Sequence, residues 1–184
     1  FQPQAATPES VASRGLGDVY KRQDIDDVIE ETLAPLNREG GENPAKVVSD
    51  LREMMQIKAG IIRNGDLLLD ALKDLDELEQ RASEVSPGGG RIYNPGWHQA
   101  LELGAMIDVS RMCALAAFRR EESRGGHTRD DFPESDHTHW GKVNSVIRQA
   151  DDGSMEIDYV SYPPIPEELE ELLDADDLAK EGKA

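Results

Sequence analysis

Charged side chains of both signs gather between residues 119 and 133, where they could form ion pairs. Four bases fall among four acids in this segment: Arg119, Arg120, Arg124 and Arg129 among Glu121, Glu122, Asp130 and Asp131. The cluster is neutral within a chain whose net charge is −18. It therefore predicts ion pairs that are buried or lie at an interface, with a helix end bearing surface salt bridges as the alternative. We expect the preceding helix to end at Gly125 and Gly126, because glycine readily adopts the left-handed cap conformation.

Other sequence patterns that could indicate a catalytic or binding site are weak. Gly15-Leu16-Gly17 could begin a dinucleotide-binding loop, but Tyr20 replaces the third glycine and no strand precedes it. The run Gly88-Gly89-Gly90 lacks the lysine and hydroxyl residue of a phosphate-binding loop, so we expect a flexible connector. Cys113 lies in an apolar helical stretch, where we expect a core thiol and not a nucleophile. We therefore predict neither a catalytic residue nor a cofactor-binding residue in this sequence.

Two histidines raise the possibility of a metal site. His137 and His139 flank Thr138, just after Asp136, and such a pair could bind a divalent metal if a third ligand approached. We favour an exposed polar turn, because neither histidine lies on an element that would fix its direction. The sequence therefore predicts no metal site.

Length and composition narrow the class of protein. The 184 residues, 38% hydrophobic and 32% charged, suffice for one sizeable core with tails. The single cysteine excludes a disulfide framework and cysteine-based zinc or iron–sulfur sites. An excess of 38 acids over 20 bases repels nucleic acid and anionic membrane surfaces. The same cysteine usage makes the cytoplasm the expected location. No apolar run reaches the ~18 residues of a membrane span and no secretory leader is recognised, so we expect a soluble protein.

Three helices are expected to position the charged cluster. Asn43-Pro44 and Asn94-Pro95 each combine a capping side chain with a proline suited to the first helical position. Asn64-Gly65 interrupts the first of these helices and precedes another stripe of apolar residues spaced by three and four. The helix that starts at Asn94-Pro95 should run from about Gly96 to Glu122. Its middle is apolar nearly all round, so we expect it to be buried on most sides.

A change of period after the third helix predicts two strands. Two stretches show a period of two. The first, residues 143–148, alternates Val143, Ser145 and Ile147 with Asn144, Val146 and Arg148, and the second, residues 155–160, alternates Met155, Ile157 and Tyr159 with Glu156, Asp158 and Val160. Asp151-Asp152-Gly153-Ser154 supplies a turn between them, so the pair is expected to form a hairpin. The predicted fold class is mainly α: an antiparallel three-helix bundle with a C-terminal β-hairpin extension.

These elements divide the chain into four segments. Residues 1–23 show no periodicity and are interpreted as an unstructured leader; residues 15–23 resemble adapter read-through, in which case this leader is artefactual and the natural protein continues upstream. Residues 24–141 are the expected helical bundle domain, beginning with an acidic helix from Asp24 to Leu33 that Pro35 ends. Residues 142–166 are the hairpin extension. Residues 167–184 form an acidic tail in which a last short helix is expected.

The charged segment also resembles a known signature. The sequence from Glu121 to Pro133, ESRGGHTRDDFP after its first glutamate, is similar to that of the succinate dehydrogenase and fumarate reductase flavoprotein subunit. Tyr93-Asn94-Pro95-Gly96-Trp97-His98 resembles the start of that family's long C-terminal helix, and Gly60-Ile61-Ile62-Arg63 the break between its first two helices. Trp140-Gly141-Lys142-Val143 and the hairpin follow in the same order. The resemblance covers residues 24 to 178 and concerns the C-terminal part of the subunit.

The resemblance implies a role in assembly. In the parent protein, separate upstream domains bind FAD and the dicarboxylate, and electrons pass to an iron–sulfur subunit. The resemblance implies that this chain contacts the FAD-binding domain and the iron–sulfur subunit, and meets the membrane only through other subunits on its cytoplasmic face. It also implies that one loop packs towards the flavin domain and orients this domain against it. The residues that match this loop are Ser123, Arg124, Gly125, His127, Arg129, Asp131, Phe132 and Pro133.

Two alternative functions remain open from the sequence. The chain could be a stand-alone acidic helical interaction module that has this fold without flavin. It could also be the C-terminal bundle of an aspartate-oxidase-like flavoprotein. The Asn94-Pro95-Gly96-Trp97-His98 start and the hairpin favour the dehydrogenase, because the oxidase is expected to lack the long hairpin extension.

Overall fold

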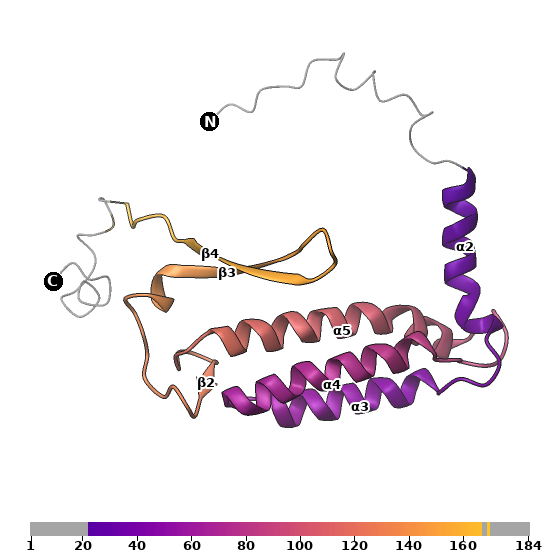
Figure 1. Cartoon of the computed structure of the whole chain (residues 1–184), viewed down its shortest axis with the longest axis horizontal. Coiled ribbons are helices and arrows are strands. Elements are labelled where there is room, and N and C mark those ends of the chain that lie inside the picture. Colours follow the sequence, from indigo (N-terminus) through magenta and orange to yellow (C-terminus); the bar gives the residue numbers. More distant parts are fainter. Residues whose placement is uncertain (1–21, 167–168, 170–184) are drawn as a thin grey trace, which may run out of the picture.

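The computed structural model describes residues 22–166 and Leu169 (Figure 1). Their regular elements are, in order, α2 (Arg22–Asn37), α3 (Pro44–Lys58), β1 (Ile62–Arg63), α4 (Gly65–Ser83), α5 (Pro95–Arg119), β2 (Thr128–Arg129), the 3-10 helix η2 (Trp140–Lys142), β3 (Val143–Gln149) and β4 (Met155–Ser161). The predicted mainly α class is confirmed. The expected leader up to residue 21, and all of the expected acidic tail except Leu169, lie outside the described residues.

Helices α3, α4 and α5 form the predicted antiparallel bundle (Figure 1). Each buries one stripe of apolar side chains against the other two, and burial of apolar surface is the main stabilising contribution to such a core. The buried cluster comprises Val47, Val48, Leu51, Met54, Ala71, Leu75, Leu78, Val85, Leu103, Ile107 and Ala114. Both stripes predicted from the spacing of apolar residues contribute to it, as does the apolar middle of α5.

An asparagine caps the start of each bundle helix. Asn43 and Asn94 were predicted to do so, whereas Asn64, expected only to interrupt or kink a helix, is the cap of α4. The side-chain oxygen of Asn43 accepts a hydrogen bond from the N–H of Ala45, and those of Asn64 and Asn94 accept from the third residue along. A capping oxygen satisfies an amide that has no partner within the helix. The chain therefore begins each helix at a defined residue.

Helix α2 departs from its expected bounds. It begins at Arg22 and continues through Pro35 to Asn37, so the prediction that Pro35 ends the helix is wrong. A proline in the last turn costs one backbone hydrogen bond but has a φ suited to a helix, and the helix continues for a short distance beyond it. The helix stands away from the bundle (Figure 1), and the indole N–H of Trp97 donates to the carbonyl of Thr32 at 2.8 Å.

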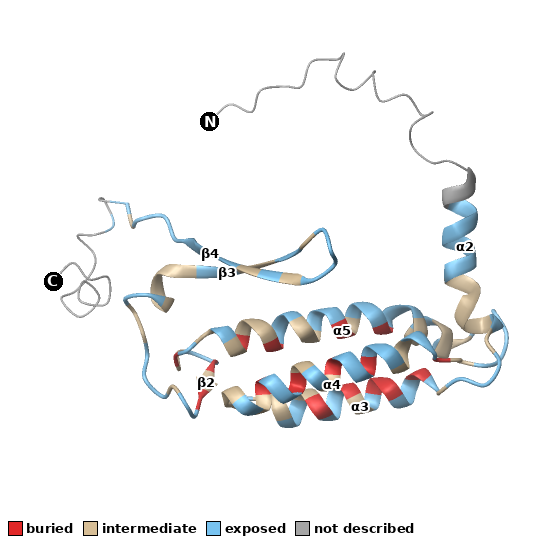
Figure 2. Cartoon of the chain, in the orientation of Figure 1, coloured by how far each residue is buried: buried red, intermediate tan, exposed pale blue. Residues whose placement is uncertain are grey.

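Helix α5 is less buried than its composition predicts. Leu103 and Ile107 are enclosed, but Val109 is 58% exposed and Cys113 is exposed as well. Exposed and intermediate stretches make up most of the α5 ribbon (Figure 2). The expectations of a helix buried on most sides and of a core thiol are therefore wrong for the described residues. The physical reason is that α3 and α4 contact one face of α5 and the hairpin covers its other side only in part, so apolar side chains there stay exposed.

The hairpin is formed as predicted. β3 and β4 pair antiparallel, from Val143 opposite Ser161 to Gln149 opposite Met155. Gly153, with φ of 85°, occupies the turn, where glycine adopts a positive φ at little cost. The hairpin lies beside α5 (Figure 1), so the chain between α5 and β3 closes one end of the bundle.

Candidate functional site

A two-residue parallel ladder brings the charged loop to the end of the bundle. β1 lies between α3 and α4, and β2 follows α5. Ile62 pairs with Thr128 and Arg63 with Arg129, and the N–H of Asp130 donates to the carbonyl of Arg63 at 2.8 Å. The loop is therefore held where α3 ends, α4 begins and α5 ends.

Arg129 caps the C-terminal end of α5. Its side chain is only 2% exposed, and its Nη1 donates to the carbonyls of Ala117 and Phe118 at 2.9 Å and to that of Arg120 at 3.3 Å. A guanidinium suits this position because the last carbonyls of a helix are unpaired and carry partial negative charge. The expectation that α5 ends at Gly125 and Gly126 is therefore wrong. The helix ends at Arg119, and the Arg129 side chain donates hydrogen bonds to its last carbonyls.

Asp131 links the same arginine to the start of α4. Its oxygens accept from Arg129 Nε at 2.7 Å and Nη2 at 2.6 Å, and also from the N–H of Gly65 at 2.9 Å. These bonds, chiefly those from Arg129, lower the pKa of Asp131 to about 2. A Cβ at Gly65 would lie 3.1 Å from the Asp131 carboxylate and 3.3 Å from the Arg129 guanidinium, so the close approach favours glycine.

Glu122 is a buried carboxylate between two arginines. It accepts from Arg120 Nε at 2.8 Å, from Arg124 Nε at 3.1 Å and from the N–H of Asp136 at 2.9 Å. Burial alone would raise the pKa of Glu122, but these three donors outweigh it and the pKa is lowered. The carboxylate is therefore ionised and compensated, as a buried charge requires.

His127 is held as a neutral imidazole. Arg63 Nη1 donates to its Nδ1 at 2.9 Å, because a guanidinium has only donors. The opposite nitrogen, Nε2, must then carry the proton that it shares with the carbonyl of Arg120 at 3.2 Å. Burial lowers the pKa of His127, and the neighbouring arginine charges lower it further.

Ser123 and the glycine turn complete the loop. The Ser123 hydroxyl donates to the carbonyl of Phe132 at 2.8 Å and accepts from the N–H of Arg129 at 2.8 Å. Gly125 has a φ of 62° within a turn in which the backbones of Arg124 and His127 bond to each other. The structure thus brings Ser123, Arg124, His127, Arg129 and Asp131 into one hydrogen-bonded loop.

The eight charged residues of the cluster divide into two groups. Arg120, Glu122, Arg124, Arg129 and Asp131 form the ion pairs just described, whereas Arg119, Glu121 and Asp130 are exposed. Sequence reasoning did not single out Glu122 and missed the roles of Arg63 and Gly65. The partners of Arg63 and Gly65 are His127 and Asp131, which lie 64 and 66 residues away along the chain. The one local signal was the position of Arg63 and Gly65 on either side of the Asn64 cap.

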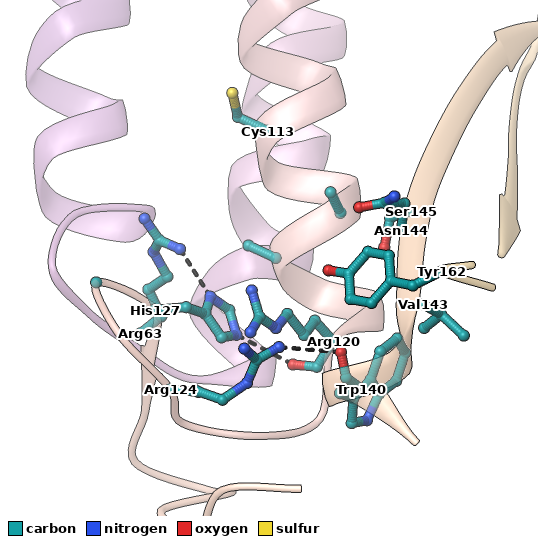
Figure 3. Close-up of a pocket in the computed structure, with 13 residues that line it drawn as sticks. Arg63, Cys113, Arg120, Arg124, His127, Trp140, Val143, Asn144, Ser145 and Tyr162 are labelled. Atoms are coloured by element: carbon teal, nitrogen blue, oxygen red, sulfur yellow. Dashed lines mark hydrogen bonds between the residues drawn. The ribbon is translucent and has the colours of Figure 1, made fainter. Parts of the chain in front are cut away.

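A pocket of about 460 Å³ adjoins the loop, between α5 and the hairpin. Arg63, Arg124 and His127 lie on its loop side, whereas Asn144 and Tyr162 lie on its hairpin side (Figure 3). Arg120, at the end of α5, lies between these two sides. Basic side chains and aromatic rings therefore face the same space.

One member of the histidine pair, His139, packs within an aromatic cluster beside the pocket. The ring of His139 packs edge-on against Trp140 at 4.7 Å between centroids, and Trp140 packs against Tyr159 at 5.3 Å. In the described part of the chain, no group of three His, Cys, Asp or Glu side chains could hold a metal ion.

No helix described here is both long and apolar enough to cross a bilayer.

The starts of the three bundle helices fit the pyrophosphate of a dinucleotide poorly. Such a group binds at a helix N-terminus whose amides are free to donate. Side-chain oxygens already accept from some of these amides: Asn43 from one at α3, Asn64 and Asp131 from two at α4, and Asn94 from one at α5.

Comparisons with known proteins identify the family. The sequence model of the fumarate reductase flavoprotein C-terminal family matches residues 48–177. A fumarate reductase flavoprotein subunit of Mycobacterium tuberculosis is 32% identical over 123 residues, which is 66% of this chain and 21% of that protein. A succinate dehydrogenase flavoprotein subunit of Coxiella burnetii is 30% identical over 153 residues, which is 80% of this chain and 25% of that protein.

Solved structures agree with this result. A chain of the Mycobacterium smegmatis Sdh1 complex superposes with a TM-score of 0.77 at 35% identity, over 87% of this chain and 28% of that one. A quinol-fumarate reductase with menaquinol molecules gives a TM-score of 0.68 at 25% identity, over 86% and 29%. This chain spans about a quarter of the proteins it resembles. The chain belongs to the fumarate reductase flavoprotein C-terminal family, the C-terminal domain of succinate dehydrogenase and fumarate reductase flavoprotein subunits.

Proposed function

We propose that this domain supports assembly of a flavoprotein subunit that interconverts succinate and fumarate. Its contacts are the FAD-binding domain of the parent protein and an iron–sulfur subunit that receives the electrons. In that complex the domain meets the membrane only through other subunits, on the cytoplasmic face. The names of the relatives, which include both dehydrogenases and reductases, support the reaction class.

Within this function, the loop residues orient the domain and do not touch substrate. Arg129 and Asp131 direct their charged atoms at each other and at helix ends, and Glu122 directs its carboxylate at Arg120 and Arg124, so these charges are compensated within the domain. Arg124, His127 and Ser123 hold the loop that carries these pairs. By this proposal the isolated chain binds no FAD and catalyses no turnover, because the chemistry belongs to the remainder of the parent protein.

The outward face of α5 is the observation that carries the proposal. Leu101 and Val109 are 42% and 58% exposed, and Met112 continues the same side of the helix. Large exposed apolar patches mark interaction surfaces, because leaving them in water is unfavourable. A helix of 25 residues with one apolar face against α3 and α4 and a second facing outward fits a domain that packs against another.

A chimera tests this proposal. Residues 22–184 would replace the corresponding part of the matching chain in the mycobacterial Sdh1 complex, and FAD content and complex yield would be measured. We expect the chimera to retain FAD and assemble, and the Val109→Asp chimera to lose both, since a carboxylate on the outward face opposes docking. Ile57→Asp is the matched control, because Ile57 is 61% exposed on α3, beside a pocket shared with α4.

Two results would contradict the proposal. Full assembly of the Val109→Asp chimera would show that the outward face of α5 is not a docking surface. Stoichiometric FAD bound to the 184-residue chain alone, or turnover of succinate by it, would show that this domain takes part in the chemistry directly.

A further inference from the structure

The pocket between α5, the charged loop and the hairpin has the properties of an anion site. We propose that it binds the carboxylate group of an organic molecule. The inference does not depend on the proposed function, because it concerns a ligand of the domain itself. It rests on the charges that line the pocket, on the nitrogen atoms left available there, and on the character of the remaining walls.

The charges in the pocket are of one sign. Three guanidiniums line it, those of Arg63, Arg120 and Arg124, and no aspartate or glutamate does. Four other pockets on the described residues are each lined by at least one aspartate or glutamate. In a chain with 38 acids and 20 bases, a purely basic lining is a departure from the general composition. It favours an anionic occupant.

The guanidiniums are fixed, and each retains donor capacity. Arg120 uses Nε and Nη2 on Glu122, and Arg124 uses Nε on Glu122 and Nη2 on the carbonyl of Trp140. Arg63 uses Nε on the carbonyls of Ala59 and Gly60 and Nη1 on His127. Among the described residues, Arg120 Nη1, Arg124 Nη1 and Arg63 Nη2 therefore have no hydrogen-bond partner.

Glu122 does not neutralise the pocket. Its carboxylate is fully buried and compensates one of the three guanidinium charges, which leaves two positive charges for an occupant. The bonds to Glu122 also hold Arg120 and Arg124 in place before any ligand arrives. Donors that are already oriented lose little conformational entropy on binding.

The remaining walls indicate an organic ligand. Ala116, Ala117 and Val143 are apolar, and Trp140 and Tyr162 add aromatic rings. A volume of about 460 Å³ exceeds the space that a carboxylate alone requires. The apolar walls would contact a hydrocarbon body, which inorganic phosphate lacks. The carboxylate could belong to a free small molecule or to an acidic side chain of a polypeptide.

Trp140 provides a direct measurement. In the Trp97→Phe chain, Trp140 is the one remaining tryptophan, and its fluorescence is titrated with sodium butyrate at constant ionic strength, with calorimetry in parallel. We expect saturable binding of butyrate and binding at least about tenfold weaker for uncharged butyramide and for inorganic phosphate. Equal affinity for butyramide, tighter binding of phosphate, or no saturable binding in either measurement would overturn the proposal.

Paired variants locate the site. Ser145→Asp places a carboxylate at the pocket wall on the exposed strand β3, away from Glu122, and should weaken butyrate binding at least about tenfold. Gln149→Asp, on the same face of β3 but about 13 Å further along, adds the same charge outside the pocket and should leave the affinity unchanged. Equal effects of the two variants would contradict the assigned location.

A last comparison separates the two sources of the carboxylate. An acetylated and amidated glutamate peptide is titrated beside butyrate under the same conditions. Tighter binding of the peptide would assign the pocket to an acidic side chain of a polypeptide, and equal or tighter binding of butyrate would assign it to a free carboxylate. Failure of both to bind would overturn the proposal, whereas the chimera experiment is unaffected by any of these results.

Discussion

Arg129 and Asp131 form a two-bond ion pair whose remaining contacts hold two different helices. Arg129 donates to the last carbonyls of α5, and Asp131 accepts from the first amide of α4. The cation therefore lies at the negative end of one helix dipole and the anion at the positive end of the neighbouring one. Because α4 and α5 are antiparallel, these two ends meet at the same end of the bundle.

Loss of the Arg129 side chain should destabilise the chain strongly. Arg129→Met leaves three α5 carbonyls and Asp131 without their donor, and we expect the free energy of unfolding to fall by about 3 to 5 kcal/mol. Urea unfolding followed by circular dichroism measures the change. Arg148→Met is the control: its side chain is 63% exposed in an ion pair with Asp158, so its loss should cost less than about 1 kcal/mol. Similar losses in both variants would refute the capping role of Arg129.

Glu122 should contribute as much to the free energy of unfolding as Arg129. Glu122→Gln keeps the shape of the side chain but leaves Arg120 and Arg124 without their buried counter-charge, so unfolding should become easier by about 3 to 5 kcal/mol. The neighbouring Glu121→Gln removes the same charge from an exposed position and should change stability by less than about 0.5 kcal/mol. A neutral effect of Glu122→Gln would mean that the charge of this carboxylate is not needed.

His127 should make stability depend on pH. Its pKa is lowered in the folded chain relative to 6.5, so below pH 6.5 the unfolded chain binds a proton that the folded chain does not. The His127 contribution is therefore fully present above pH 6.5 and is lost as the pH falls from 6.5 towards its folded pKa. Denaturant unfolding between pH 5 and 7.5 should show this loss, and His127→Gln should remove it. The step should persist in His98→Gln, in which an exposed histidine of α5 is replaced.

The two faces of α5 should respond differently to truncation. Leu103→Ala and Ile107→Ala remove enclosed side chains and should each cost about 2 to 5 kcal/mol. Val109→Ala, on the outward face, should cost less than about 1 kcal/mol in the isolated chain. Far-ultraviolet circular dichroism should be dominated by helix throughout. A cost below about 1 kcal/mol at both Leu103 and Ile107 would mean that they do not form the core.

Elements that are determined by residues close to them along the chain were predicted from the sequence. The asparagine caps before Pro44 and Pro95 act within three residues, and the hairpin turn at Gly153 acts within four, so both could be predicted from the sequence. The resemblance to a family signature supplied one further set, the loop residues Ser123, Arg124, His127, Arg129 and Asp131.

Features that depend on distant partners could not be predicted. The end of α5 is set by Arg129, well beyond the helix, and the orientation of His127 is set by Arg63, 64 residues away. Periodicity describes the polarity of a helix face but not whether a neighbour covers it. For this reason the apolar composition around Cys113 predicted burial, whereas the described residues leave that thiol exposed.

The parallel ladder between β1 and β2 restricts how the domain can vary in length. Arg63 must reach Arg129, so α4 leaves from the same end of the bundle to which α5 returns, and both helices are anchored there. An insertion of one residue within either helix would rotate everything beyond it by about 100° and break the match with the apolar stripe. In the connection between Ser83 and Pro95, at the opposite end, Val85 is buried and Ser86 is hydrogen-bonded to Glu42, but residues 88–93 are exposed and lie outside any ladder. Natural insertions and deletions between β1 and β2 should therefore accumulate in that connection, while the lengths of α4 and α5 stay constant.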